Sequence, residues 1–272
     1  MIGDKLRTAA KVASVEEGWD LANAVYNDVY AFNIAAQETN AQGIFFKPDG
    51  TKMYIIGTGG DSVNEYNLST AWDVSTASYV QLFSVAAQET FPTGLFFKPD
   101  GTKMYVIGQT GDDVNEYNLS TAWDVSTASF VQVFSVGAEE PTPTGLFFKP
   151  DGTKMYIIGS IGDSVNEYNL STAWDVSTAT YYRSVKISSQ EITPTGLFFK
   201  PDGTKMYVVG QAGDDVNEYV LSVAWDISTA IYSQNFSFAL QTISPEDIFF
   251  KPDGKKLYLV ASDRQAVFSY DL

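Results

Sequence analysis

The 272-residue sequence contains no cysteine and no histidine. It therefore cannot form a disulfide, a thiolate or imidazole metal site, a cysteine nucleophile or a Ser-His-Asp triad. Without cysteine, nothing in the sequence reports on the redox compartment. Long apolar runs are also missing, so we expect no membrane insertion, and residues 1–18 lack the continuous apolar stretch of an ordinary secretory signal.

Basic residues are scarce as well. The chain has 17 Lys and Arg against 33 Asp and Glu, which gives a net charge of −16. Such a charge repels the phosphates of nucleic acids and of anionic lipids, so nucleic acid is not an expected partner. An acidic surface keeps a protein soluble in crowded or extracellular surroundings, and we expect a location on an extracellular surface or a virion.

One unit is repeated along the chain. The tetrapeptide KPDG recurs every 51 residues, and a Trp-Asp pair recurs with nearly the same spacing. A period of this length is typical of solenoids, propellers and arrays. KPDG starts at Lys47, Lys98, Lys149, Lys200 and Lys251, and the tryptophans are Trp19, Trp72, Trp123, Trp174 and Trp225.

The unit has the pattern of four short strands. In residues 94–136 the segments GLFFK, KMYVIG, VNEYNL and SFVQVFSV are rich in β-branched and aromatic residues. A Pro-Asp-Gly turn, a Gly-containing turn and the longer STAWDVSTA segment separate them. Four antiparallel strands per unit, called a to d in chain order, predict one blade of a β-propeller.

The chain ends predict a closed ring. The last unit stops after strand c, and the segment from Trp19 to Ala36 matches the Trp-Asp loop and strand d alone. Pairing these ends completes a fifth blade and removes two exposed sheet edges; exchange of the end strand between two chains is the alternative. We predict an all-β, five-bladed propeller over residues 18–272, and a tail or short helix over residues 1–17 that could join a larger assembly.

The motifs also resemble those of known propellers. FFKPDGKKLYLV (249–260) and its counterparts are similar to the strand-turn-strand of YVTN and TolB-like repeats. The complete unit resembles uncharacterised bacterial and phage proteins over residues 19–272. The Trp-Asp pair is similar to that of WD40 repeats, without their Gly-His pair. These resemblances imply a propeller and supply no catalytic residue. In architecture the ring is similar to tachylectin-2 lectins, in which each blade contributes a sugar site.

Sequence variation distinguishes the two faces of the predicted ring. Residues 94–130 and 145–181 are identical at 31 of 37 positions, and three of the six differences lie in the b–c loop. The a–b and c–d loops, on the opposite face, are nearly invariant in the middle units. Either the face formed by the d–a and b–c loops, here called the varied face, meets a ligand, or these loops tolerate drift.

Repeated side chains give alternatives for each motif. Glu38, Glu89, Glu140 and Glu191 would ring the channel mouth, where they would either hold a hard cation such as Ca²⁺ or bond loop backbone. For the Asp after the Gly of each b–c loop we favour a turn-stabilising role. We expect each loop Trp to be a packing anchor rather than a sugar platform. The Lys of strand b and the Glu of strand c are expected to form ion pairs.

The candidate ligand-binding residues lie in the varied loops or in the last unit, where Pro245-Glu246-Asp247 and Asp263-Arg264-Gln265 depart from the repeat. They are Glu38, Glu89, Thr90, Gln109, Thr110, Asp113, Glu140, Ser160, Asp163, Glu191, Gln211, Asp215, Glu246, Asp263 and Arg264.

Three functions fit this pattern. The leading prediction is a multivalent, lectin-like module that binds carbohydrate or a surface receptor through several weak sites. A passive structural or decoration component of a particle is the alternative, and a carboxylate- or metal-dependent hydrolase near Glu246 and Asp263 is the third. Equivalent carboxylates share similar environments, and nothing in the repeat separates an acid from a base. We therefore predict that the protein is not an enzyme and has no catalytic residues, and no cofactor besides Ca²⁺.

Overall fold

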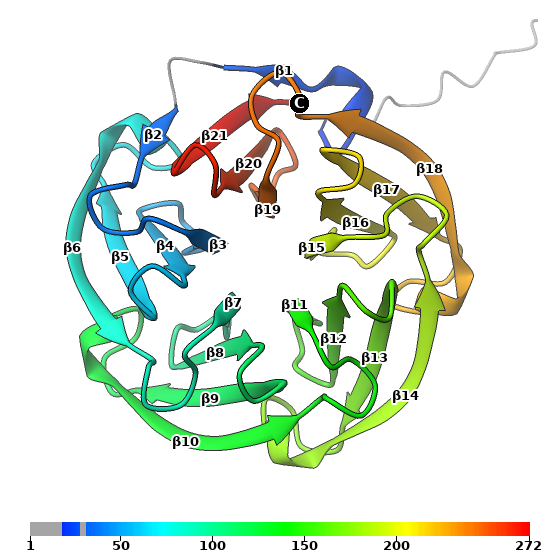
Figure 1. Cartoon of the computed structure of the whole chain (residues 1–272), viewed down its shortest axis with the longest axis horizontal. Coiled ribbons are helices and arrows are strands. Elements are labelled where there is room, and N and C mark those ends of the chain that lie inside the picture. Colours follow the sequence, from blue (N-terminus) through cyan, green and yellow to red (C-terminus); the bar gives the residue numbers. More distant parts are fainter. Residues whose placement is uncertain (1–17, 28–30) are drawn as a thin grey trace, which may run out of the picture.

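The structure, a computed structural model, describes residues 18–27 and 31–272. These residues form five antiparallel sheets arranged in a ring around a central axis, with one strand of each sheet innermost (Figure 1). The predicted five-bladed β-propeller is confirmed. The predicted tail over residues 1–17 lies outside the described residues. No helix in the described part of the chain is long and apolar enough to cross a bilayer.

Each of the first four blades consists of four consecutive strands. Blade 1 comprises β3 (Ala41–Phe46), β4 (Lys52–Gly57), β5 (Ser62–Leu68) and β6 (Ala77–Ser84). Blade 2 comprises β7 (Pro92–Phe97), β8 (Lys103–Gly108), β9 (Asp113–Leu119) and β10 (Ala128–Ser135). Blade 3 comprises β11 (Pro143–Phe148), β12 (Lys154–Gly159), β13 (Ser164–Leu170) and β14 (Ala179–Lys186). Blade 4 comprises β15 (Pro194–Phe199), β16 (Lys205–Gly210), β17 (Asp215–Leu221) and β18 (Ala230–Ser237).

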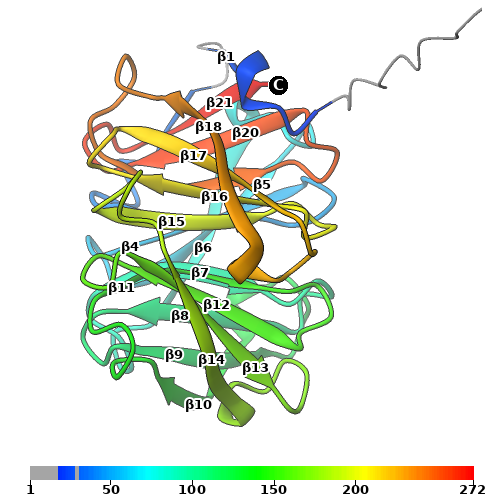
Figure 2. The ribbon, with the colours of Figure 1, turned by 90° about the vertical axis from the view of Figure 1, so that its right-hand side faces the viewer.

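Blade 5 joins the two ends of the chain. Its inner strands are β19 (Pro245–Phe250), β20 (Lys256–Ala261) and β21 (Ala266–Asp271). The outer edge comes from the N-terminal segment, where β1 (Val25–Tyr26) and β2 (Phe32–Asn33) both pair antiparallel with β21. Figure 2 shows β1 beside β21 on the side of the ring. Closure by the N-terminal strand, within one chain, is therefore confirmed.

The Pro-Asp-Gly turn is held by its own side chains. In blade 2, Asp100 accepts a 3.0 Å hydrogen bond from the amide of Thr102 and pairs with Lys98 at 2.7 Å. Gly101 has a φ of 73°, in the left-handed region that favours glycine. A side chain there would also collide with Trp123, because a Cβ atom on Gly101 would lie 2.3 Å from the indole nitrogen.

The repeated tryptophans connect neighbouring blades. The Trp123 ring stacks on Phe97 of its own blade and on Phe45 of blade 1, and only 8% of the residue is exposed. Its carbonyl oxygen accepts a 2.7 Å hydrogen bond from the phenol of Tyr54 in blade 1. The other four tryptophans accept the corresponding bond. The predicted role as a packing anchor is confirmed.

A second connection between blades runs through a buried carboxylate. Glu116 of β9 pairs with Lys103 of β8, as predicted for these strands. The same buried carboxylate accepts hydrogen bonds from Gln132 in β10, at 2.9 Å, and from the amide of Val176 in blade 3, at 3.2 Å. That amide begins the short 3₁₀ helix η5 (Val176–Thr178). The equivalent helices are η1 (Leu21–Asn23), η3 (Val74–Thr76), η4 (Val125–Thr127) and η6 (Ile227–Thr229).

Candidate functional site

The central channel narrows at a ring of five phenylalanines. One residue of each innermost strand contributes, and successive rings meet edge to face with centroids 5.2 to 5.3 Å apart. Leucine and isoleucine complete the lining of a small pocket at this ring, and Asp247 is the single acidic residue among the lining residues. The five rings belong to Phe45, Phe96, Phe147, Phe198 and Phe249. The repeat therefore builds an apolar channel, and Asp247 alone breaks it.

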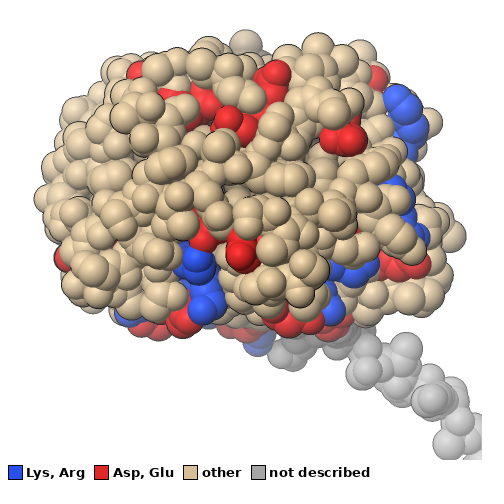
Figure 3. All heavy atoms as spheres, turned by 90° about the horizontal axis from the view of Figure 1, so that it is seen from below, with Lys and Arg blue, Asp and Glu red and all other residues tan. Residues whose placement is uncertain are grey.

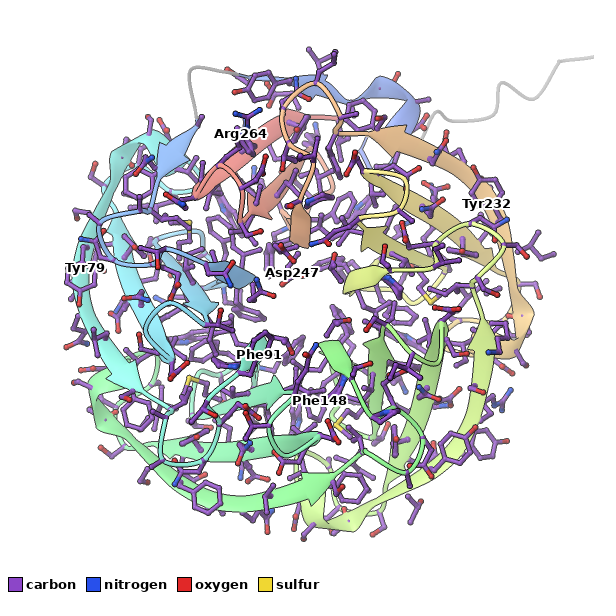
Figure 4. The ribbon with its side chains drawn as sticks, viewed as in Figure 1. Tyr79, Phe91, Phe148, Tyr232, Asp247 and Arg264 are labelled. Carbon is purple, nitrogen blue, oxygen red and sulfur yellow. The ribbon has the colours of Figure 1, made fainter. Side chains whose placement is uncertain are left out.

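Asp247 occupies a position that is glycine in the other blades. Gly196 is its counterpart in blade 4, and a Cβ atom on Gly196 would lie 2.5 Å from a carboxyl oxygen of Asp247. Glycine at that position thus makes room for the carboxyl group. The oxygens accept hydrogen bonds from the amides of Ile44, at 3.0 Å, and Ile248, at 2.8 Å. Figure 4 shows Asp247 at the channel, where it connects blade 5 to blade 1.

Protein atoms surround the Asp247 carboxyl group, which retains partial contact with solvent only through the channel. This burial raises its pKa to about 8, and the neighbouring charge of Glu246 acts in the same direction. The two backbone hydrogen bonds oppose the shift without cancelling it. At neutral pH the group is therefore largely protonated.

Glu246 lies on the varied face beside the channel. It is the extra residue of a β-bulge in β19, and in blade 2 the corresponding Thr93 bonds the carbonyl of Pro143 in the next blade. Glu246 is only 4% exposed and accepts hydrogen bonds from Gln211 of blade 4, at 3.0 Å, and from the Ser262 hydroxyl. Burial raises its pKa to about 7, the two hydrogen bonds lower it, and the charge of Asp263 raises it further.

In blade 5, Asp263 supplies a carboxylate where the repeated glutamate is absent. Where the other blades carry a glutamate, this blade has Thr242, whose hydroxyl bonds Asp263. Asp263 also lies 3.4 Å from the guanidinium of Arg264, which donates a 3.0 Å bond to the carbonyl of Gln241. The loop is thus held by a different network from its counterparts, and Arg264 remains largely exposed on the varied face (Figure 4).

The repeated glutamates are engaged with backbone. Glu89 is fully buried, and one of its oxygens accepts hydrogen bonds from the amides of Phe91, at 2.6 Å, and Thr110, at 3.1 Å. Glu38, Glu140 and Glu191 bond the same two loops of their own blades. Within residues 18–27 and 31–272 no group of three or more acidic residues could hold a metal ion. The Ca²⁺ ring has no assembled ligand set here and stays a prediction.

The other candidates form small separate groups on the varied face. The hydroxyls of Thr90 and Thr110 lie 2.9 Å apart, and Ser160 lies 3.1 Å from a threonine of its own blade. Burial and the nearby charge of Glu89 raise the pKa of Asp113 to about 6. Asp163 adopts a φ of 43°, and its carbonyl accepts a 2.9 Å hydrogen bond from the amide of Ile187, which follows the outer strand of the same blade.

Two further candidates also bond only within their own blades among the contacts described. Burial raises the pKa of Asp215, which accepts hydrogen bonds from two asparagines of blade 4. The amide of Gln109 donates a 3.1 Å hydrogen bond to the carbonyl of Phe91. These groups lie in different blades and do not converge on one point.

Part of the asymmetric site was predicted from the sequence. Gln211 and Glu246 were both candidate ligand-binding residues, and the structure brings them into contact. Asp247 and Ser262 were not among the candidates. The signal for Asp247 was present in the sequence, as a carboxylate in place of the glycine that precedes Leu-Phe-Phe or Ile-Phe-Phe in the other units. Nothing local marked Ser262 as a partner of Glu246.

No family model matches this sequence, and no curated protein is similar to it in sequence. Similarity to solved structures is extensive and shows the fold. A protein from Bacteroides fragilis, assigned provisionally as a 6-phosphogluconolactonase, is 15% identical, with a TM-score of 0.52 over 85% of this chain and 79% of its own. A protein from Bacteroides uniformis with the same assignment is 14% identical.

The alignment with the Bacteroides uniformis protein covers 81% of this chain and 64% of that one, with a TM-score of 0.50. The chain spans 55% of the length of a similar protein from Lactobacillus plantarum. U3-55K is 7% identical, with a TM-score of 0.53 over 91% of this chain and 100% of its own. These structures confirm the propeller, while the resemblance to phage proteins stays a prediction.

The prediction that the protein is not an enzyme is contradicted. Propellers of similar fold include provisionally assigned lactonases, so this architecture accommodates hydrolytic chemistry. The prediction rested on the similar surroundings of equivalent carboxylates around the ring. Glu246 and Asp247 have no equivalent carboxylates in the other blades. Their hydrogen bonds and burial differ, which is the separation of environments that acid–base catalysis needs.

Proposed function

We propose that the protein is a hydrolase of small esters or lactones, with Glu246 as its acid–base group. The observation that carries this proposal is the asymmetric carboxyl pair at the channel, where the pKa of Glu246 is raised to about 7. A general base or acid acts best when its pKa lies near the working pH, and burial commonly produces this shift. The lactones named for two propellers of similar fold support the substrate class.

The reaction would proceed by general base catalysis. The Glu246 carboxylate removes a proton from a water molecule while the water oxygen attacks the acyl carbon of the ester. The bond between the acyl carbon and the ring or alkoxy oxygen then breaks, and the carboxyl group returns the proton to that oxygen. Gln211 and Ser262 both donate a hydrogen bond to Oε1 of Glu246 and so orient the carboxylate.

The test measures proton release from δ-gluconolactone and nitrophenol release from p-nitrophenyl acetate by the purified chain. The variant Glu246→Gln keeps the hydrogen-bonding shape and removes the base, and we expect a rate at least about a hundredfold lower. Asp113→Asn, which changes a carboxyl group of raised pKa in a repeated loop, is the matched control and should retain the rate. Equal rates for Glu246→Gln and the unmodified chain would refute the assignment of Glu246, and absence of hydrolysis would refute the reaction class.

A second candidate function is recognition of carbohydrate or a surface receptor through the varied face. It is favoured by exposed apolar side chains on these loops, including Phe91 at 43%, Ile161 at 63% and Ile192 at 58% exposure. Apolar groups gathered on one face of a soluble protein commonly mark a contact surface. Similar weak contacts from several blades would add through avidity when the target repeats.

This candidate is tested on a glycan array, with Ca²⁺ and with chelator, and on immobilised cell-surface extracts. Binding that is lost when Phe91, Ile161 and Ile192 are changed together to serine supports a recognition face. A chelator effect would assign a metal to it. No binding under either condition favours the passive component of a particle.

A further inference from the structure

The outer rim of the ring carries repeated aromatic side chains. At one equivalent position in each of β6, β10, β14 and β18 the ring is between 39% and 45% exposed. Figure 4 shows two of them, Tyr79 and Tyr232, on the perimeter. The four residues are Tyr79, Phe130, Tyr181 and Tyr232. We call the solvent-facing side of these four strands the outer belt.

The belt rings are held in a fixed orientation. Tyr79 lies opposite Tyr66 in the β5–β6 register and meets it edge-on, with ring centroids 5.8 Å apart and an interplanar angle of 71°. The three other pairs have separations of 5.7 to 6.0 Å and angles of 71° to 74°. In blade 5, Tyr26 packs on Tyr270 with centroids 5.5 Å apart. Each blade therefore presents a preorganised aromatic group.

A β-bulge widens the surface beside these rings, with an apolar side chain in blades 1 to 3 and Ser233 in blade 4. The register between β5 and β6 shifts after Tyr79, so that Val80 is an extra residue next to the ring. Val80 is 41% exposed, and its counterpart in blade 3, Tyr182, is 52% exposed. On the other side of the ring lie exposed hydroxyls, such as Ser78 in blade 1 and Ser129 in blade 2. In blades 1 to 3 the belt thus combines an aromatic ring with a neighbouring hydroxyl group, whereas blade 4 has Ile231 at that position.

The belt also excludes negative charge. The chain has 33 Asp and Glu, yet β6, β10, β14 and β18 contain none. Their two cations already have partners, because Arg183 pairs with Asp226 and Lys186 bonds the carbonyl of Gly162 at 2.8 Å. In the side view of Figure 3, uncharged residues form most of the surface and charged ones form small separate groups. A charged ligand would find no counter-charge on the belt.

We propose that the outer belt binds a neutral polysaccharide, whose sugar rings stack on the aromatic side chains. Rigid aromatic faces with adjacent hydroxyls suit the alternation of C–H and O–H groups on a sugar. A polymer of repeated uncharged units matches a surface that repeats from blade to blade and carries no free charge. Each stacking contact is weak, and successive blades add to the affinity because one chain of sugars can reach more than one of them. This site is separate from the channel and independent of the proposed hydrolase.

The test is affinity electrophoresis of the folded chain in native gels that contain dextran, galactomannan or mixed-linkage β-glucan, with polygalacturonate as the charged comparison. The first variant, Tyr79→Ser/Phe130→Ser/Tyr181→Ser/Tyr232→Ser, removes the rings. The second, Ser78→Asp/Ser129→Asp/Thr180→Asp, keeps the rings and their packing and adds charge beside them. The matched control, Ala71→Asp/Ala122→Asp/Ala173→Asp, adds the same three charges at exposed positions on the face opposite the varied face.

We expect at least one neutral polysaccharide to retard the unmodified chain and the control equally. The apparent affinity should fall about tenfold or more in the charged variant, which folds even if the ring-deleted variant does not. No retardation of the unmodified chain, or equal retardation of the charged variant, would overturn the proposal. Stronger retardation by polygalacturonate would overturn the neutral class. A dimer that the charged variant dissociates, seen by light scattering without polysaccharide binding, would show a protein interface instead.

Discussion

The phenol of Tyr207 donates a 3.1 Å hydrogen bond to the main-chain oxygen of Trp19, which lies 188 residues earlier in the chain. The same bond, from Tyr105 to Trp174, joins blades 2 and 3 in the middle of the sequence. Closure of the ring therefore uses the ordinary contact between blades. Lys205 adds a second donor to the Trp19 oxygen at 2.8 Å.

The first prediction concerns this contact. Tyr105→Phe should lower the free energy of unfolding by about 1 to 2 kcal/mol, because a buried carbonyl loses its phenol donor. Tyr207→Phe should cost no more, because Lys205 still donates to the Trp19 oxygen. Urea unfolding of both variants at 25 °C measures the difference. A much larger loss for Tyr207→Phe would mean that the closing blade is held less firmly than the others.

The second prediction concerns the buried carboxylate between blades. Glu116→Ser copies the residue of blade 5, where Ser269 stands at the equivalent position with no hydrogen-bond partner for its hydroxyl among the described residues. The change removes the partners of Lys103, Gln132 and the Val176 amide, and should cost about 3 to 5 kcal/mol. Ser269→Ala is the control and should change stability by less than about 0.5 kcal/mol. Similar losses for the two variants, by denaturant unfolding, would contradict this account.

The third prediction concerns the turn beneath the tryptophan. Gly101→Ala should destabilise the protein by more than about 2 kcal/mol, because φ is 73° and the new Cβ atom would strike the Trp123 indole. Gly60→Ala is the matched control in an exposed loop, where the nearest atom would be a serine hydroxyl at 3.2 Å. It should cost less than about 1 kcal/mol. Thermal unfolding with tryptophan fluorescence follows both, and an undisturbed Trp123 in Gly101→Ala would argue against the packing.

The fourth prediction concerns pH. The pKa of Asp247 is raised to about 8 in the folded chain and lies near 4 in the unfolded one. The unfolded chain releases this proton first, so stability should fall as pH rises from about 4 to about 8. Asp247→Asn removes this component, and relative to the unmodified chain it should gain stability over that window, by a few kcal/mol.

Urea midpoints at pH 4, 6 and 8 measure the effect. The stability of Glu246→Gln relative to the unmodified chain should change in the same direction over a narrower pH range, since the pKa of Glu246 is raised to about 7. Asp49→Asn is a control in which the pH dependence of stability should have the opposite sign. The pKa of Asp49 is lowered to about 2 by its bonds to Lys47 and Thr51, so this variant should lose stability above pH 4 and approach the unmodified chain below it. A parallel pH profile for Asp247→Asn and the unmodified chain would disprove the shift.

Several features of the site were predictable because they are local. Glu246 and Asp263 stood out as departures from the repeat, and the structure places both in networks that the other blades lack. The glutamates at the channel mouth had two alternatives, and the structure gives Glu38 and Glu89 backbone partners in their own blades. Asp247 escaped selection because its significance depends on Ile44 and Gly196, which belong to the two neighbouring blades.

By itself the sequence determined the blade, the number of blades and the closure of the ring. These follow from the runs of β-branched and aromatic residues, from the Pro-Asp-Gly turn and from the complementary chain ends, which are features of the sequence itself. Only the tertiary structure decided the chemistry of the channel and the outer belt. The pKa of a carboxyl group depends on burial by residues from other blades, and the exposure of an aromatic ring depends on how far neighbouring blades separate at the rim.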